Sequence, residues 1–213
     1  MSTENAIERI AEARVVPVIA IEDADRAIPL ADALIAGGLP VIEITFRTEA
    51  AADVIHLLSR ERPELLVGAG TVLTPANAQR AHDCGAAFAV SPGLNPAVVR
   101  AAQECELLFA PGIMTPSDVE AALGLGISTM KYFPAEAIGG VRFLKSMAAP
   151  FKHLNVRFIP TGGVKPGNLA DYLAEPSVVA AGGTWIAKSD VIAAGDWDTV
   201  TANCREARQI ANA

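Results

Sequence analysis

Hydrophobic residues gather in eight short runs along the chain, roughly 20 to 26 residues apart. Each run has the length of a buried strand, and several contain few polar residues, as strands buried on both faces do. The predicted strands are Val15–Ile21, Val41–Arg47, Leu65–Val72, Phe88–Pro92, Leu107–Ile113, Thr129–Pro134, Arg157–Thr161 and Val178–Ile186.

The segments between these runs have helical character and recognisable starts. Thr74-Pro75, Asn95-Pro96 and Thr115-Pro116 each place an N-cap residue before a proline at the first helical position. Gly37-Gly38 suits the end of an earlier helix. A further short helix is expected from Glu4 to Ala13, before the first strand.

Strand and helix alternate through the whole chain, without a linker or a break in composition. Eight such units predict an α/β fold, a (β/α)8 TIM barrel that forms one domain over residues 1–213. The N-terminal helix is expected to cover the bottom of this barrel. The competing fold is a doubly wound open sheet, but its glycine-rich fingerprint is missing, because Glu22-Asp23 follows the first strand directly.

Composition excludes several broad classes of protein. With 51% hydrophobic and 19% charged residues among 213, the chain is unlike a disordered or linker protein. The mean hydropathy is +0.32, yet no uncharged apolar run of 18 residues is present. Residues 1–14 lack the apolar stretch of a signal peptide. We therefore expect a cytoplasmic protein with no membrane partner.

The charge balance limits the kind of ligand. A net charge of −7 argues against nucleic-acid binding through general basicity, so an anionic ligand must be held by a few local groups. The cysteines and histidines lie far apart, without disulfide or metal-ligand spacing, so we expect reduced thiols and no metal site. They are Cys84, Cys105, Cys204, His56, His82 and His153.

Three charged residues fall on predicted inward faces. Strand side chains alternate, so Glu43 and Arg47 share one face of the second strand, while its other face is entirely apolar. The same alternation directs Lys131 and Phe133 inward from the sixth strand. Because buried charges are costly unless they are paired, these residues need an explanation.

Two interpretations remain open for these charges. The first is an interior ion pair that merely fixes the register of the strands. The second is chemical: a desolvated lysine near another cation supplies a free amine that attacks a carbonyl group, and a neighbouring carboxylate moves the protons. Arg47 would supply the second cation and bind a substrate carboxylate. Together these are the parts of a Schiff-base lyase.

Glycine pairs lie near the carboxyl ends of the last two predicted strands, at Gly162-Gly163 after Thr161 and at Gly182-Gly183 before Thr184. Phosphate sites in barrels occupy this position. Backbone N–H groups approach an anion closely where there is no side chain, and a short helix near Lys188–Ile192 would add its dipole. One pair alone is typical of a tight turn, but two pairs favour phosphate binding.

Six motifs occur in order along the chain and carry a resemblance to a known family. They are Val15-Val16-Pro17-Val18-Ile19, Glu43-Ile44-Thr45-Phe46-Arg47-Thr48, Gly68-Ala69-Gly70-Thr71-Val72-Leu73, Ser91-Pro92-Gly93, Phe133-Pro134-Ala135-Glu136 and Pro160-Thr161-Gly162-Gly163. From about Ile7 to the C-terminal helix, the chain closely resembles the bifunctional aldolases of 2-keto-3-deoxy-6-phosphogluconate (KDPG) and 4-hydroxy-2-oxoglutarate (KHG).

The resemblance implies a class I aldolase of the Entner–Doudoroff pathway, without metal or cofactor and usually a homotrimer of (β/α)8 subunits. It would cleave KDPG to pyruvate and glyceraldehyde 3-phosphate, with cleavage of KHG to pyruvate and glyoxylate as a second candidate activity. By position, Lys131 matches the Schiff-base lysine and Glu43 the general acid/base. The implied substrate contacts are Arg47 and Thr71 at the pyruvate carboxylate, Pro92 and Phe133 along the pocket, and Thr161, Gly162, Gly163, Gly183 and Thr184 at the phosphate.

Three other functions stay open at this point. A barrel isomerase or epimerase of phosphosugars would use Glu43 to abstract a proton and Lys131 only as an electrostatic stabiliser. A related 2-keto-3-deoxy sugar-acid aldolase would keep the imine but take another substrate. A sugar-phosphate binding protein would use the charges only to hold its ligand.

Overall fold

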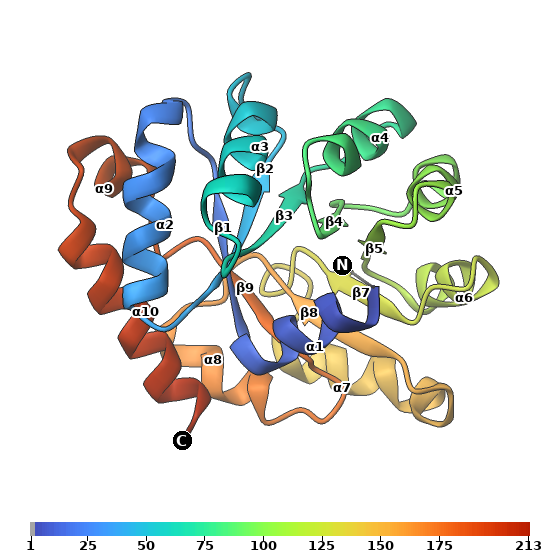
Figure 1. The fold of residues 1–213 in the computed structure, drawn as a ribbon. Helices are drawn as coiled ribbons and strands as arrows, with labels where there is room; N and C mark the ends of the chain where they lie inside the picture. Colours follow the sequence, from blue (N-terminus) through green and yellow to red (C-terminus); the bar gives the residue numbers. More distant parts are fainter. Residues whose placement is uncertain (1–2) are drawn as a thin grey trace.

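The computed structural model describes residues 3–213. Parallel strands form the centre of the molecule, and most of the helices lie around the outside (Figure 1). The strands are β1 (Val15–Ile19), β2 (Val41–Thr45), β3 (Leu66–Gly70), β4 (Phe88–Val90), β5 (Leu108–Ala110), β6 (Gly112–Ile113), β7 (Thr129–Tyr132), β8 (Arg157–Pro160) and β9 (Ala181–Gly183). Every predicted run therefore contains a strand.

Most strands pair with the next strand along the chain, and the last strand, β9, pairs with the first, β1. One sheet has the order β5-β4-β3-β2-β1-β9 and a second has β6-β7-β8. The fifth predicted strand is divided in two at Pro111, which lacks a backbone N–H to donate. Isolated parallel bridges join Phe158 to Val178 and Thr161 to Gly182, beside β8 and β9. The α/β class with a curled parallel sheet is confirmed, and this order excludes the doubly wound alternative.

Helices occupy the segments between the strands. They are α1 (Thr3–Ala13), α2 (Ala27–Ala36), α3 (Ala51–Glu61), α4 (Pro75–Asp83), α5 (Pro96–Glu104), α6 (Pro116–Gly124), α7 (Gly140–Ala148), α8 (Pro166–Leu173), α9 (Ser189–Ala194) and α10 (Trp197–Ala211), with 3-10 turns η1 (Ala24–Arg26) and η2 (Ala149–Leu154). The predicted caps are confirmed, because the side chains of Thr74, Asn95 and Thr115 each accept a hydrogen bond from the first turn of the helix that follows.

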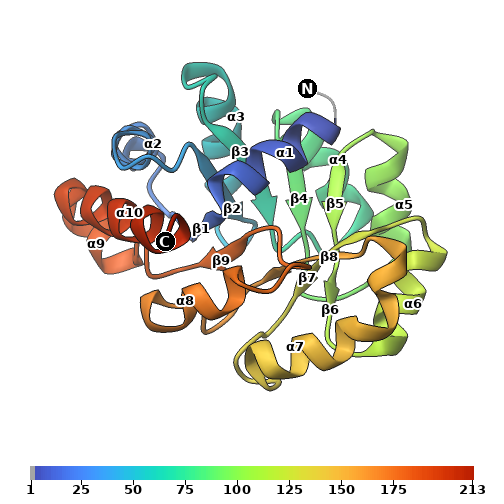
Figure 2. The same cartoon turned by 90° about the horizontal axis from the view of Figure 1, so that it is seen from below.

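Two hydrophobic clusters fill the two faces of the sheet. Outward side chains such as Ile42 and Met130 pack in the cluster that the surrounding helices share. Inward side chains at the amino-terminal ends of the strands, such as Val41 and Leu66, pack with Ile10 of α1. Helix α1 therefore covers the bottom of the sheet, as predicted, and Figure 2 shows it lying across this end. Within residues 3–213, none of the helices has the length and apolar character that crossing a membrane requires.

Candidate active site

Glu43 and Lys131 meet inside the curled sheet. Lys131 Nζ donates to Glu43 Oε1 at 3.0 Å and to Oε2 at 3.3 Å, although the residues are 88 positions apart. The glutamate is 4% exposed and the lysine 5%, so the ion pair is almost completely desolvated. The structure thus brings together the two residues for which the sequence predicted catalytic roles, and at this distance a proton can pass directly between them.

The alternation of side chains along the strands explains this placement. Ile42 and Ile44 pack toward the helices, which leaves Glu43 on the inward face of β2. Lys131 is directed inward from β7 for the same reason. Its ammonium lies 5.7 Å from the centroid of the Phe133 ring, within the range of a cation–π contact.

Gly70 makes room for the carboxylate. It ends β3 opposite Thr45 of β2, and a Cβ at position 70 would lie only 2.2 Å from Glu43 Oε1. The side chain of Glu43 therefore occupies the space that any other residue at position 70 would need. Gly70 lies in one of the six sequence motifs, but the motif alone assigns it no function. The available signal was a glycine on the strand beside the one that carries a buried carboxylate.

The expectation that Arg47 lies inside the barrel is wrong. Strand β2 ends at Thr45, the chain turns at Phe46 and Arg47, and the arginine is exposed. Alternation holds only while the backbone stays extended, so the inward direction ends with the strand. Two of the three predicted interior charges are buried, and the third lies beyond the carboxyl end of β2.

Thr45 contacts this arginine from inside. Its hydroxyl, in a residue that is 2% exposed, donates to the carbonyl of Ile19 at 3.0 Å. The same oxygen accepts a hydrogen bond from Arg47 Nε at 3.1 Å. The Thr45 hydroxyl therefore links the Arg47 side chain to the backbone at the end of β1. The sequence placed Thr45 on the inward face but did not predict this contact.

Thr71 and Pro92 follow β3 and β4 at the same end of the sheet as Glu43. Thr71 has φ +58°, in the left-handed region that β-branched residues rarely adopt. Pro92 is exposed, and its carbonyl carbon would lie 2.2 Å from a Cβ at Gly112. Residues held in such rarely populated backbone conformations cluster at functional sites.

The glycine-rich turn after β8 exposes backbone donors. Thr161 is buried, whereas Gly162 and Gly163 have φ of +95° and +87°, which only glycine adopts easily. Among the described residues, the N–H groups of Gly162, Gly163 and Val164 donate to no other protein group. Consecutive unpaired N–H groups are the feature that backbone anion sites share.

The second glycine pair lies beside this turn. Gly182 is bridged to Thr161, and a Cβ on it would lie 2.3 Å from Thr161 Oγ1. Gly183 lies under the ring of Trp185, and Thr184 is exposed after β9. Helix α9 begins at Ser189, close to the predicted start, but it has only six residues.

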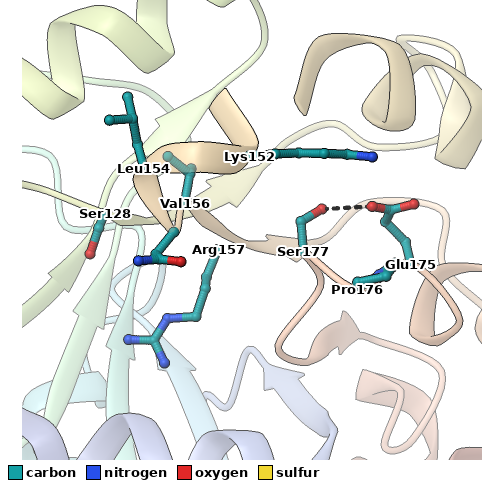
Figure 3. A pocket seen from close by; sticks show the side chains of 9 residues that line it. Ser128, Lys152, Leu154, Val156, Arg157, Glu175, Pro176 and Ser177 are labelled. Atoms are coloured by element: carbon teal, nitrogen blue, oxygen red, sulfur yellow. Dashed lines mark hydrogen bonds between the residues drawn. The ribbon is translucent and has the colours of Figure 1, made fainter. Parts of the chain in front are cut away.

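A separate cavity of about 640 Å³ lies at the amino-terminal ends of β7 and β8 (Figure 3). Its lining residues are Ser128, Lys152, Leu154, Asn155, Val156, Arg157, Glu175, Pro176 and Ser177. In Figure 3 the Ser177 hydroxyl points to the carboxylate of Glu175, to which it donates at 3.1 Å. None of the predicted site residues lines this cavity, so the sequence-based site belongs to the opposite end of the sheet.

The three cysteines are free thiols, as predicted. Cys204 is completely buried, and this burial raises the pKa of its thiol to about 12. Among the side chains that the structure describes, no group of three or more His, Cys, Asp or Glu is arranged to hold a metal ion.

Comparisons with known proteins agree on one family. The family model described as "KDPG and KHG aldolase" matches residues 6–203. The 2-dehydro-3-deoxy-phosphogluconate aldolase of Haemophilus influenzae is 46% identical over 205 residues, which cover 96% of each chain. The KHG/KDPG aldolase of Escherichia coli K12 is 47% identical over 193 residues, covering 91% of this chain and 90% of that one.

Solved structures give the same result. KDPG aldolase from Legionella pneumophila, with pyruvate captured as a covalent carbinolamine intermediate, superposes with a TM-score of 0.90 at 38% identity, over 94% of this chain and 96% of that one. The aldolase of Zymomonas mobilis ZM4 with 3-phosphoglycerate superposes with a TM-score of 0.88 at 40% identity, over 96% and 94%.

Proposed function

The chain belongs to the KDPG and KHG aldolase family, and we propose that it cleaves KDPG to pyruvate and glyceraldehyde 3-phosphate through a Schiff base on Lys131. The observation that carries this proposal is the buried contact of 3.0 Å between Lys131 Nζ and Glu43 Oε1. It is supported by the carbinolamine that pyruvate forms in the Legionella pneumophila relative.

Imine formation uses both members of the ion pair. Glu43 takes a proton from Lys131, and the free amine attacks the C2 ketone of KDPG to form a carbinolamine. Glu43 then returns the proton to the C2 hydroxyl, which leaves as water. The product is a protonated imine, whose positive charge lies next to a carboxylate that is 4% exposed.

Bond cleavage follows from this imine. Glu43, directly or through a water molecule, takes the proton of the C4 hydroxyl, the C3–C4 bond breaks, and its electron pair flows into the imine. Glyceraldehyde 3-phosphate leaves, and Glu43, directly or through the same water molecule, returns this proton to C3 of the remaining enamine. Hydrolysis of the imine releases pyruvate and restores Lys131. Covalent catalysis divides one difficult cleavage into easier steps.

The ends of the substrate are assigned to separate groups. Arg47 and Thr71 would hold the pyruvate carboxylate, and Pro92 and Phe133 would line the pocket. The unpaired N–H groups after β8 support binding of the phosphate there. The phosphate contacts proposed are Thr161, Gly162, Gly163, Gly183 and Thr184. The name of the Escherichia coli relative supports cleavage of KHG as a second activity.

We propose further that residues 1–213 form one closed (β/α)8 barrel. In support, β5 and β6 follow each other in one predicted strand, and isolated bridges join the β8 and β9 segments. The family resemblance suggests a cytoplasmic homotrimer that needs no metal or cofactor. Leu73 and Met114, which are 51% and 44% exposed beyond β3 and β6, supply apolar surface for contacts between subunits. Light scattering on the purified protein tests the trimer.

The decisive experiment is trapping with borohydride. Incubation with pyruvate and borohydride should add one reduced pyruvate to Lys131, detected by peptide mass, and Lys131→Met should abolish the adduct. An isomerase or epimerase forms no imine, so the absence of an adduct would favour that function. A binding protein would also fail to exchange the methyl protons of pyruvate in deuterated water. Turnover of KDPG, its C4 epimer and the dephosphorylated analogue then identifies the substrate.

A further inference from the structure

Glu136 and Tyr172 form a contact that the mechanism above does not use. Tyr172, on α8, is 1% exposed, and its hydroxyl donates to Glu136 Oε1 at 2.5 Å. Glu136 lies in the turn after β7, in a motif that carries the family resemblance. Burial, and then the hydrogen bond to Glu136, raise the pKa of Tyr172, so its hydroxyl keeps the proton that it donates.

The stem of Glu136 packs against the proposed phosphate turn. A Cβ at Gly163 would lie 2.6 Å from both Cβ and Cγ of Glu136. The backbone N–H of Glu136 donates to the carbonyl of Gly162 at 3.0 Å, and that of Ala135 donates to the carbonyl of Thr161 at 2.8 Å. The turn after β7 therefore supports the turn after β8 over two consecutive residues.

A third contact completes this support. The side-chain amide of Asn168 donates to the carbonyl of Gly163 at 3.2 Å. In a planar trans peptide, the N–H of the next residue points opposite to the carbonyl. The carbonyls of residues 161–163 all point to protein donors. The N–H groups of residues 162–164 therefore point away from those donors. Among the described residues, these three N–H groups have no hydrogen-bond partner in the protein.

We propose that Glu136 and Tyr172 are positioning residues for the substrate phosphate. Tyr172 holds the Glu136 carboxylate, and Glu136 keeps the 161–163 turn in the conformation that presents its N–H groups to an anion. The carboxylate is itself negatively charged, so it acts through the turn and does not bind phosphate. This inference rests on the proposed aldolase function and assigns the part of the site that selects phosphorylated substrates.

The test separates phosphate recognition from the chemistry at Lys131. Tyr172→Phe removes only the donor, Glu136→Ala removes the acceptor and the stem, and Glu136→Gln keeps an oxygen acceptor of the same length. Tyr132→Phe is the matched control, because its buried hydroxyl donates to the carbonyl of Gly140 at 3.1 Å and not to Glu136. Measured quantities are kcat and KM for KDPG and its dephosphorylated analogue, inhibition by inorganic phosphate, and exchange of pyruvate methyl protons.

Loss of a hydrogen bond to a charged group should raise KM for KDPG and the inhibition constant of phosphate about tenfold in Tyr172→Phe and Glu136→Ala. KM for the dephosphorylated analogue, kcat and pyruvate exchange should stay near wild type, as should all constants of Glu136→Gln and Tyr132→Phe. The proposal is overturned if both substrates lose affinity equally, if no constant changes, or if Glu136→Gln is as impaired as Glu136→Ala. A wrong aldolase assignment would give a different result: the wild-type protein itself would not exchange the methyl protons of pyruvate.

Discussion

Gly70→Ala tests whether the space beside Glu43 is required for catalysis. The added methyl carbon would lie 2.2 Å from Glu43 Oε1 and 2.9 Å from both Cδ and Cγ. Real Cβ atoms essentially never come within 3.0 Å of a heavy atom of a residue that is not their chain neighbour, so the carboxylate must move. It cannot swing into solvent without leaving the pair, because Glu43 is buried and already contacts Lys131 at 3.0 Å.

The size of the effect follows from these distances. Relief of the clash displaces the carboxylate by roughly 1 Å, and a misplacement of that size reduces turnover by about 100-fold, or about 3 kcal/mol in activation free energy. Overpacking should also lower the free energy of unfolding by about 1–3 kcal/mol. The backbone itself tolerates alanine, since Gly70 is not among the glycines with positive φ. Catalysis should therefore fall much further than the folded fraction.

Turnover of KDPG and urea unfolding are the two measurements required. Gly124→Ala is the control, because a Cβ there meets nothing within 4 Å; its kcat should equal that of wild type. Glu43→Gln should lose turnover to a similar degree as Gly70→Ala. The reasoning is refuted if Gly70→Ala keeps more than half of the wild-type kcat, or if its loss matches the unfolded fraction measured in urea.

Three further predictions concern the ion pair, Arg47 and alkaline pH. Lys131→Met should abolish pyruvate trapping. It should also lower the free energy of unfolding by about 3–5 kcal/mol, because Glu43 stays buried without a partner. In urea titrations, the double variant Lys131→Met/Glu43→Gln should regain much of this stability, but it should remain inactive. Thr45→Val removes the acceptor for Arg47 Nε and should raise KM for pyruvate about tenfold in the proton-exchange assay; an unchanged KM would show that Thr45 does not position Arg47. Burial raises the pKa of Cys204 from 9.0 to about 12. At a pH between these two pKa values, the thiol loses its proton in the unfolded chain but keeps it in the folded chain. The free energy of unfolding should thus fall as pH rises through this window, and urea titrations should show a shallower fall for Cys204→Ala; identical slopes would contradict this reasoning.

The strands were predictable because a strand that is buried on both faces is a short run of mostly hydrophobic residues. The proline-capped helix starts and the contact between Lys131 and Glu43 followed from local rules, namely capping and side-chain alternation. The exposure of Arg47 was not predictable in this way, because the turn after Thr45 depends on where β2 stops pairing with β3. Pattern alone cannot give that end to within a residue or two.

Contacts between segments that are far apart in the chain also could not be predicted from the sequence. The sequence around Gly70 does not indicate that the carboxylate of Glu43, on the neighbouring strand, fills the space that a side chain at position 70 would need. The same holds for Tyr172, which reaches Glu136 across 36 residues. Such contacts depend on how strands and helices are placed relative to one another, and only the folded chain specifies that placement.

The pairing of the strands also bears on whether the Lys131–Glu43 contact merely fixes register. Strand β2 is paired with β3 at five positions and with β1 at two, and β7 is paired with β8 at four and with β6 at two. These ladders connect neighbours, whereas the ion pair joins two strands that are not adjacent in either sheet. Register is therefore specified without it, and a buried ion pair is often no more stabilising than apolar side chains of similar volume. A purely structural role leaves the desolvation of two charges unexplained, while imine chemistry needs both an amine and a proton acceptor at this distance.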